Sequence, residues 1–442
     1  MTSSAEARSP ATAAVPPAPT LTRTTNQRAA IRRIPLRDRA WMPFHTVRAA
    51  GPIRPPSIDL VRDLLVQLWS ADPQHPLLCR IDEQRGWQQP VSIDDLDAYL
   101  SSVVIEAQVD ADAVGLARLL QAVPLGGLPF VIVISDHAAA MRSAHVIGDT
   151  ATANPWFFGL LRAADPERAL SMITAGRSSH FPLAAALIKE FGRDPRGAVR
   201  ALRHALPLGP AGKSVPELPT VASGIPELIN ETAAPGLEAD LRRWRAEHAP
   251  KASVAALWMA AAVRALRAEG IDPGHGVFTM MNGRRYLPEG AAVRGNFAAG
   301  PYLVPDDLGD PSSLGSELAS AATDGVPLVL LTAITARSLF RLGRPGRMPI
   351  GGGGNPKLNL SHFGSIADDD LDWDVTDRDP HARYVVAAEP AGPNAITYVF
   401  ARSPYGMHLS ATAHQECIDV VALRSALHRV STDPVGLLDE AS

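Results

Sequence analysis

The sequence predicts a mixed α/β fold of the α+β type, and three observations support this prediction. Apolar residues make up 46% of the 442-residue chain and charged residues 20%, which is a globular composition. Helical and strand-like hydrophobic patterns follow one another in irregular order, which argues against a regular βαβ winding. No segment repeats at a fixed period, which argues against a solenoid or a propeller.

The first half of the chain is expected to combine helices with buried strands. Residues 57–70 place leucines and valines at helical spacing, and residues 92–104 form a second helix with Ser92 as its N-cap. Residues 130–135 form a continuous β-branched run, which predicts a strand buried on both faces. The segment from about residue 143 to 161 is expected to be mostly helical. A further strand is predicted at residues 76–81 and further helices at residues 182–191 and 195–205.

A proline-rich segment divides the chain. Residues 206–233 contain five prolines and three glycines without a sustained period, which predicts a crossing loop over residues 207–234. This loop separates an N-terminal lobe (31–206) from a C-terminal lobe (235–442), and residues 1–30 are expected to be a disordered tail. In the second lobe, helices are predicted at residues 237–248, 254–269, 312–323, 326–342 and 420–429, and strands at 277–281, 302–304, 357–360, 384–387, 395–400 and 408–411.

Charge and composition exclude several classes of protein. A net charge of −4 provides no basic field that would attract nucleic acid or anionic lipid. Cys79 and Cys417 lie in apolar contexts and are predicted to be small core residues, which fits a reducing cytoplasm. No apolar run approaches the roughly 18 residues of a membrane span, and the N-terminus lacks the apolar core of a signal peptide. We therefore expect a cytoplasmic protein without a membrane span.

Several catalytic and binding motifs are missing from the sequence. There is no Gly-x-Ser-x-Gly elbow for a hydrolase serine. The glycine run at Gly351–Gly354 lacks the lysine and hydroxyl of a phosphate-binding loop, and we interpret it as a flexible loop. Neither His-Glu-x-x-His nor paired Cys-x-x-Cys occurs, so no metal site is predicted.

The most informative candidate is His137, which follows the buried strand at 130–135. A histidine at the end of such a strand is held rigidly and is partly desolvated, so that a neutral imidazole can take a proton from an attacking hydroxyl or amine. General-base help of this kind accelerates a reaction about 10²–10⁴-fold. The alternative is a histidine that only satisfies backbone groups at the strand end.

A second candidate pair lies eight residues further along the chain. His145 and Asp149 are four residues apart, a spacing that places both side chains on one face of a helix, where the carboxylate can orient the ring. The alternative is an ordinary surface pair. Because no strong strand is predicted immediately before His145, this pair ranks behind His137.

The hydrophobic strand that runs into His137 resembles the signature of the condensation-domain and CoA-dependent acyltransferase superfamily. The motif of this superfamily is His-His-x-x-x-Asp-Gly, or minimally His-x-x-x-Asp. Other stretches resemble the superfamily in the same order, and the likeness spans about residues 31–435. These stretches are His75-Pro76-Leu77-Leu78, Asn282-Gly283-Arg284 with Leu287-Pro288, Gly295-Asn296, and Ser361-His362-Phe363-Gly364.

The resemblance implies two chloramphenicol-acetyltransferase-like lobes in a V-shaped pseudo-dimer with a central tunnel. It implies no permanently bound cofactor, and a donor that is a CoA thioester or an acyl group on the phosphopantetheine arm of an acyl or peptidyl carrier protein. His137 would activate a small amine or alcohol acceptor for direct attack on the thioester. Arg284, Asn296, Ser361 and His362 would shape the site.

The resemblance is incomplete at the motif itself. With His137 as the motif histidine, Asp136 replaces the first histidine, Met141 the aspartate and Arg142 the glycine. Loss of that aspartate is expected to leave Arg284, Arg285 or Arg294 without its partner, and Arg142 is expected to narrow the tunnel. Asp136 would serve as a new partner or orient His137. His362 replaces the family's asparagine opposite the site, either as a second titratable group or as a strand-face residue.

Two functions follow from this resemblance. The first is a stand-alone condensation enzyme or acyltransferase that forms an amide or ester, in secondary metabolism such as nonribosomal peptide or antibiotic biosynthesis. The second is a catalytically altered protein that acts as a recruitment platform or runs a cyclisation, and it is motivated by Met141 and Arg142. We favour the enzyme, because the strand and its terminal histidine are intact.

Overall fold

The computed structural model describes residues 31–108, 111–176, 178–205, 224–340, 356–366, 370–375 and 382–440. The predicted tail at 1–30, the glycine run at 351–354 and residues 207–223 of the predicted crossing loop lie outside the described residues. Mixed sheets and many helices in irregular order confirm the predicted mixed α/β class.

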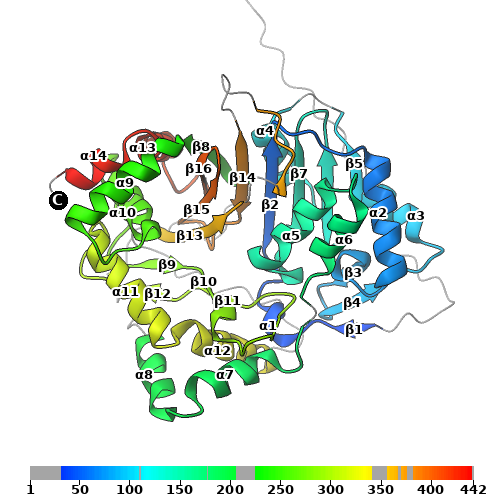
Figure 1. Cartoon of the computed structure of the whole chain (residues 1–442), viewed down its shortest axis with the longest axis horizontal. Coiled ribbons are helices and arrows are strands. Elements are labelled where there is room, and N and C mark those ends of the chain that lie inside the picture. The colour runs from blue at the N-terminus through cyan, green and yellow to red at the C-terminus, as the bar shows by residue number, and fades with distance from the viewer. Residues whose placement is uncertain are drawn as a thin grey trace, which may run out of the picture.

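Two large sheets stand side by side in the centre of the molecule (Figure 1). The N-terminal sheet has the strand order β14-β2-β7-β6-β5, and the C-terminal sheet has the order β12-β9-β13-β15-β16-β8. The first consists of β14 (Arg383–Ala388), β2 (His45–Gly51), β7 (Ala139–Ala144), β6 (Phe130–Ile134) and β5 (Val104–Glu106). The second consists of β12 (Tyr302–Leu303), β9 (Val277–Thr279), β13 (Lys357–Ser365), β15 (Ala395–Ser403), β16 (Gly406–Ala413) and β8 (Glu227–Ala233).

Small strands and short helical turns complete the β structure. They are β1 (Arg32–Arg33), β3 (Cys79–Asp82) and β4 (Trp87–Pro90), the pair β10 (Met281–Asn282) and β11 (Ala298–Ala299), and the turns η1 (Pro76–Leu78), η2 (His145–Ile147) and η3 (Gly283–Tyr286).

Helices cover both sheets. Around the N-terminal sheet lie α1 (Leu36–Arg39), α2 (Ile58–Ala71), α3 (Leu96–Val103), α4 (Ala113–Ala122), α5 (Thr150–Leu161) and α6 (Pro166–Thr174). The rest of the chain adds α7 (Pro182–Phe191), α8 (Pro195–Ala205), α9 (Pro235–His248), α10 (Val254–Ala268), α11 (Pro311–Thr323), α12 (Val326–Phe340), α13 (Val420–Thr432) and α14 (Pro434–Asp439). Figure 1 shows α5 in front of the N-terminal sheet and α4 behind it.

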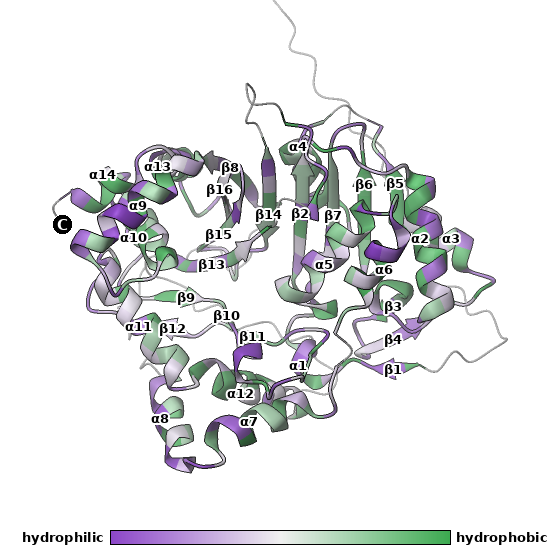
Figure 2. Cartoon of the chain, viewed as in Figure 1, coloured by the Kyte–Doolittle hydropathy of each residue, from purple (hydrophilic) through white to green (hydrophobic). Residues whose placement is uncertain are grey.

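Each sheet has its own apolar core. One cluster of buried side chains surrounds β2, β6, β7 and β14, and a second surrounds α10 and the strands β13, β15 and β16. In Figure 2 the central strands of the N-terminal sheet are largely hydrophobic, whereas α9 at the rim carries hydrophilic residues. The two cores are the main source of stability expected from burial of apolar area.

Most predicted elements are confirmed within a few residues, including the buried strand β6 and the helices α2, α7, α8, α9 and α10. Four predictions are wrong in part. The helix predicted from about residue 143 begins only at Thr150, because residues 139–144 form β7. Residues 227–233 form β8 rather than part of a crossing loop. The helix predicted over 92–104 begins at Leu96 with Asp95 rather than Ser92 at its N-cap position, and the strand predicted over 76–81 begins only at Cys79. Among the described residues, no single helix is both long and apolar enough to cross a membrane.

One strand from the C-terminal half of the chain joins the N-terminal sheet. β14 belongs to the C-terminal half of the chain, yet it pairs with β2 along six residue pairs, from Arg383 with Gly51 to Ala388 with Thr46. It also contacts the neighbouring sheet, because the Val386 N–H donates to Ser410 Oγ of β16 at 3.2 Å. The two sheets are therefore joined where backbone amides of β14 donate to side chains of β16.

Candidate functional site

The two candidate histidines lie at opposite ends of the same strand. β6 and β7 form an antiparallel hairpin with His137 in its turn, and β7 ends at Ala144, immediately before His145. A strand rises about 3.4 Å per residue, so the six residues of β7 separate the two histidines by roughly 20 Å. At this separation the two histidines cannot serve the same reacting centre. His145 was ranked second because no strand was predicted before it, and that prediction is wrong, since β7 ends at Ala144.

His145 is fixed by contacts on several sides. Its main-chain N–H donates to Phe44 O at 2.8 Å, which continues the pairing of β7 with β2. Its main-chain carbonyl accepts a hydrogen bond from Asn296 Nδ2 at 2.9 Å. The imidazole stacks on the indole of Trp41, with ring centroids 4.3 Å apart and an interplanar angle of 13°. The ring is thus held in one orientation while part of the residue stays accessible.

Asp149 connects the two halves of the chain. Its Oδ2 accepts from Arg284 Nη1 at 2.7 Å and from the Phe297 N–H at 2.8 Å. Asp149 stands at the N-cap position of α5, but its side chain makes no cap hydrogen bond; Oδ2 is directed to Arg284 and Phe297 instead. Gly148 permits the close approach of this turn to α5, since a Cβ there would lie 2.7 Å from Thr152 Cβ.

Both terminal nitrogens of Arg284 make hydrogen bonds. In addition to Asp149 it donates through Nη2 to Thr152 Oγ1 at 3.1 Å, to Val293 O at 3.2 Å and to Gly295 O at 2.8 Å. The expectation that Arg284 lacks its partner is therefore wrong, and Arg294 likewise pairs with Asp72 at 3.2 Å. A partly buried pair of this kind stabilises the fold only while both members are present.

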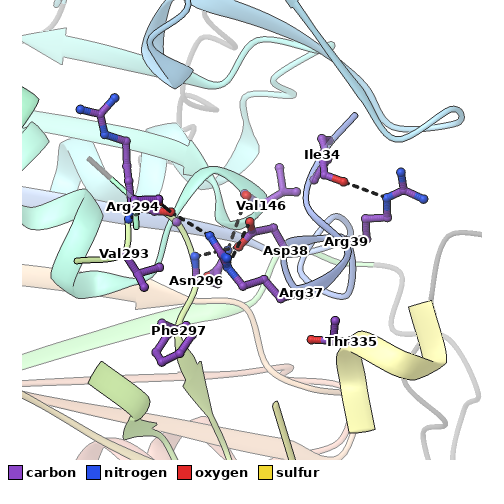
Figure 3. Close-up of polar contacts among 12 residues, drawn as sticks. Ile34, Arg37, Asp38, Arg39, Val146, Val293, Arg294, Asn296, Phe297 and Thr335 are labelled. Carbon is purple, nitrogen blue, oxygen red and sulfur yellow. Dashed lines mark hydrogen bonds and ion pairs between the residues drawn. The ribbon is translucent and has the colours of Figure 1, made fainter. Parts of the chain in front are cut away.

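Asn296 links His145 to a buried carboxylate. The Asn296 N–H donates to Asp38 Oδ1 at 2.7 Å, and Asp38 also faces Arg37 (Figure 3). Arg37 lies beside Asp38 in α1, and its Nη2 donates a hydrogen bond to the Arg294 carbonyl at 3.1 Å (Figure 3). Gly295 has a φ of +105°, a left-handed conformation that favours glycine and turns the chain so that the next amide meets Asp38.

Burial sets the protonation of this site. Burial lowers the pKa of His145 below its ordinary value of 6.5, so the imidazole is neutral at pH 7. Burial also raises the pKa of Asp38 from 3.8 to about 6, against the opposing effects of Arg37 and the hydrogen bonds from Asn296. A neutral histidine is the form that can accept a proton.

Buried polar atoms without a hydrogen-bond partner gather here. Among the described residues, four such atoms belong to this one site: Trp41 Nε1, His145 Nδ1, Asp149 Oδ1 and Asn296 Oδ1. Buried polar groups of folded proteins are nearly always satisfied, and exceptions concentrate where function demands them. This concentration distinguishes the His145 end of β7 as the candidate site.

The residues around His137 lie elsewhere. Asp136 is exposed and His137 is half-buried in the β6–β7 turn, where its carbonyl accepts from the Ile53 N–H at 2.9 Å. Met141 is a core residue within β7. Arg142 points to the α4 side of the sheet, where it donates to Leu120 O at 3.0 Å and to Glu389 at 3.3 Å. The expected narrowing of a tunnel by Arg142 therefore has no support from its position.

Ser361 and His362 face opposite sides of β13. Leu358 and Leu360 belong to the C-terminal core cluster, and alternation along the strand places His362 on the same side, toward α9. Burial lowers the pKa of His362, whose charged neighbours are Glu238 and Arg402. Ser361 is buried on the other face of the strand. His362 therefore corresponds to the strand-face alternative, on the side away from Ser361.

Two other buried histidines are structural. His75 Nδ1 accepts from the Leu77 N–H at 3.3 Å, and its Nε2 contacts Ile173 O at 3.3 Å. His408 contacts Thr232 Oγ1 through Nδ1, at 3.2 Å, and Ser403 Oγ through Nε2, at 2.7 Å. Burial lowers the pKa of both to about 3. Both nitrogens of each ring are occupied, in contrast to Nδ1 of His145.

In the part of the chain that the structure describes, no group of three or more His, Cys, Asp or Glu side chains is placed to hold a metal ion. Cys79 is buried, and burial raises the pKa of its thiol to about 12, which is unfavourable for a thiolate nucleophile.

Solved structures share the arrangement of these elements. A trichothecene 15-O-acetyltransferase from Fusarium sporotrichioides superposes with a TM-score of 0.64 at 11% identity, over 92% of this chain and 97% of that one. The condensation domain of the Monacolin K polyketide synthase superposes with a TM-score of 0.55 at 14% identity, over 92% of this chain and 96% of that one. The chain has the fold of the condensation-domain and CoA-dependent acyltransferase superfamily.

A third solved structure with this fold carries a different activity. An epimerization domain of tyrocidine synthetase B superposes with a TM-score of 0.51 at 12% identity, over 91% of this chain and 92% of that one. No protein-family model and no curated protein sequence matches the chain. The likeness therefore establishes the fold, and the chemistry has to be argued from the site.

The sequence contained a signal for the site that was ranked too low. His145 and Asp149 have the spacing of the minimal condensation-type motif, His-x-x-x-Asp, and the structure gives Asp149 the arginine partner that this motif implies. Sequence reasoning missed Trp41, Asp38 and Thr152. Their contacts join segments that are more than 100 residues apart, and no local pattern indicates them.

Proposed function

We propose that this chain is an acyltransferase in which His145 acts as the general base. The single observation that supports this most strongly is the state of His145: a neutral, oriented imidazole whose ring nitrogen Nδ1 is buried among unsatisfied polar atoms at the end of β7. The condensation-type fold supports the reaction class. The residues that position the ring and its surroundings are Trp41, Asn296, Asp149 and Arg284.

The proposed reaction is direct transfer from a thioester to an amine or alcohol. His145 takes the proton of the nucleophile as it attacks the thioester carbonyl, and the tetrahedral intermediate then collapses with loss of the thiolate. The proton passes from His145 to that thiolate, so the products are an amide or ester and a free thiol. No covalent enzyme intermediate is required. The donor is a CoA thioester or an acyl group on a carrier protein.

The test uses a matrix of acyl-CoA and acyl-pantetheine thioesters against small amines and alcohols, with release of free thiol as the readout. On a productive pair, His145→Ala is expected to lower the rate about 10²–10⁴-fold, the range of a lost general base. His137→Ala is the matched control, because it removes a histidine from the other end of the same strand. Its rate is expected to stay within about twofold of the wild-type rate.

Two results would contradict the proposal. If His137→Ala abolishes turnover and His145→Ala does not, the reacting centre lies at the hairpin turn. If no pair gives thiol release above background while the protein binds carrier proteins, the platform function is favoured instead. The structural motivation for the platform is weak. Met141 and Arg142 suggested it, but both lie within β7, and the motif counted from His145 has its aspartate at Asp149.

A further inference from the structure

Arg48 is a buried cation of unusual status. It lies in the middle of β2 and is 1% exposed. Three other arginines of the chain have a carboxylate partner: Arg284 with Asp149 at 2.7 Å, Arg294 with Asp72 at 3.2 Å and Arg142 with Glu389 at 3.3 Å. Within the described ranges, no carboxylate lies at ion-pair distance from Arg48. A buried charge without a counter-charge is costly, which calls for an explanation.

The partners of Arg48 are neutral and come from three elements. Nε donates to Asn154 Oδ1 of α5 at 2.7 Å, and Nη1 donates to Thr46 Oγ1 at 2.9 Å and to Ser143 Oγ at 3.4 Å. Tyr384 of β14 donates to the same Asn154 oxygen at 3.1 Å. These bonds fix the plane of the guanidinium without neutralising its charge.

The guanidinium lies close to His145. Thr46 and Ser143 face each other across β2 and β7, and Ser143 precedes His145 by two residues. At about 3.4 Å per residue, the charged group is roughly 7 Å along the strand from the proposed base. The electrostatic effect of Arg48 on the pKa of His145 is in the direction expected of a nearby cation, which lowers it.

We propose that Arg48 binds a carboxylate carried by a substrate of the acyl-transfer reaction, and so selects substrates with an acid group close to the reacting atom. This inference rests on the proposed function of His145. A guanidinium binds carboxylates through charge-assisted hydrogen bonds. Nη2 is the nitrogen of Arg48 that remains for such a bond, because Nε donates to Asn154 and Nη1 donates to Thr46 and Ser143. The acid group belongs either to the acceptor, as in an amino or hydroxy acid, or to the acyl group, as in a dicarboxylic acid.

The first test measures anion binding without turnover. Thermal unfolding of the full chain is followed with propionate and benzoate and with their neutral amides, propionamide and benzamide. Each carboxylate is expected to raise the Tm more than its amide, because a ligand that binds only the folded state stabilises it. Arg48→Met is expected to abolish this difference. Arg142→Met is the matched control, since Arg142 already has Glu389, and it is expected to retain the difference.

The outcomes decide the proposal in either direction. Equal effects of carboxylates and amides on the wild-type protein, or a preference that survives in Arg48→Met, would overturn it. Should Arg48→Met not fold, Arg48→Lys provides the test, because it keeps the charge but loses the planar fork. Its affinity for the carboxylate is expected to be weaker by about tenfold.

A second test identifies the source of the acid group. Binding of succinyl-CoA is compared with that of butyryl-CoA, and binding of β-alanine with that of β-alaninamide, in the wild-type protein and in Arg48→Met. A preference that depends on Arg48 in the first pair assigns the carboxylate to the donor, and one in the second pair assigns it to the acceptor. His145→Ala is expected to retain the carboxylate preference. Loss of turnover in His145→Ala and loss of binding in Arg48→Met are therefore separate results.

Discussion

The two ends of β7 differ in how they connect to the rest of the chain. At the turn end, His137 follows an exposed aspartate, and the hairpin is closed by local bonds such as the Ala138 N–H to Ser135 Oγ at 3.1 Å. At the other end, His145 meets Trp41 from the start of the fold and Asn296 from the second half. Both ends present a histidine next to a strand, but distant segments converge only on the second.

The candidate site of this protein is marked by distant segments that converge on His145, and not by the local sequence around a histidine. At His145 the surrounding segments leave polar atoms such as Asp149 Oδ1 buried and without partners among the described groups. An arrangement that leaves such groups unpaired lowers stability, and selection for folding alone would remove it. The comparison predicts large effects of substitution at one end of β7 and small effects at the other.

The largest effect is expected from Asp149→Asn. The substitution leaves the cation of Arg284 without its counter-charge in a partly buried position, which is expected to lower the free energy of unfolding by about 3–5 kcal/mol. Asp136→Asn is the control at the other end of β7, and its exposed position predicts a change within about 0.5 kcal/mol. Urea unfolding of both variants measures the two values. Similar losses in both would remove the proposed asymmetry.

The same comparison shows what the sequence could and could not predict. The strand at 130–134 was predicted because its β-branched run is a local signal. β7 was missed because Ala139–Ala144 is rich in alanine, which favours helix, and its extended state depends on pairing with both β2 and β6. His145 was ranked second because no strand was predicted before it. Both histidines were therefore identified from the sequence, but His137 was ranked above His145.

The contacts of the site were less predictable than its fold. Arg284 and Asn296 were identified from their resemblance to condensation-type segments, and the structure does bring them to His145 and Asp149. Trp41 carries no such signal, because its contact with His145 joins two segments through space. Tertiary contacts of this kind follow from the whole fold and not from any window of the sequence.

An intermediate effect is expected from Asp38, which supports Asn296 on the His145 side. Its pKa is about 6 in the folded protein, above the ordinary 3.8, because the carboxyl is buried. The folded state therefore binds more protons than the unfolded state between these values, and stability falls as the pH rises through this window. The contribution of this one group is about 2–3 kcal/mol, present in full below pH 3.8 and lost above pH 6.

Asp38→Asn isolates this contribution, because the amide does not titrate. The difference in unfolding free energy between the wild-type protein and Asp38→Asn is expected to favour the wild type more at pH 4 than at pH 7. Urea titrations at a series of pH values measure it. Asp136→Asn, at the exposed turn, is measured in parallel as the reference substitution. A constant difference for Asp38→Asn would mean that folding does not raise the pKa of this carboxyl.

The smallest effect is expected from Trp41→Leu, which removes the ring stacked on His145. The loss of stacking is expected to lower the unfolding free energy by about 1 kcal/mol, and Trp41→Phe, which keeps a ring, should lose less.

Removing the indole also admits water to the imidazole, so the pKa of His145 is expected to rise toward its ordinary value of 6.5. On a productive substrate pair, the acidic limb of the pH–rate profile should then move to higher pH in Trp41→Leu. An unchanged acidic limb, with stability lowered as expected, would mean that Trp41 supports the fold without setting the protonation of His145.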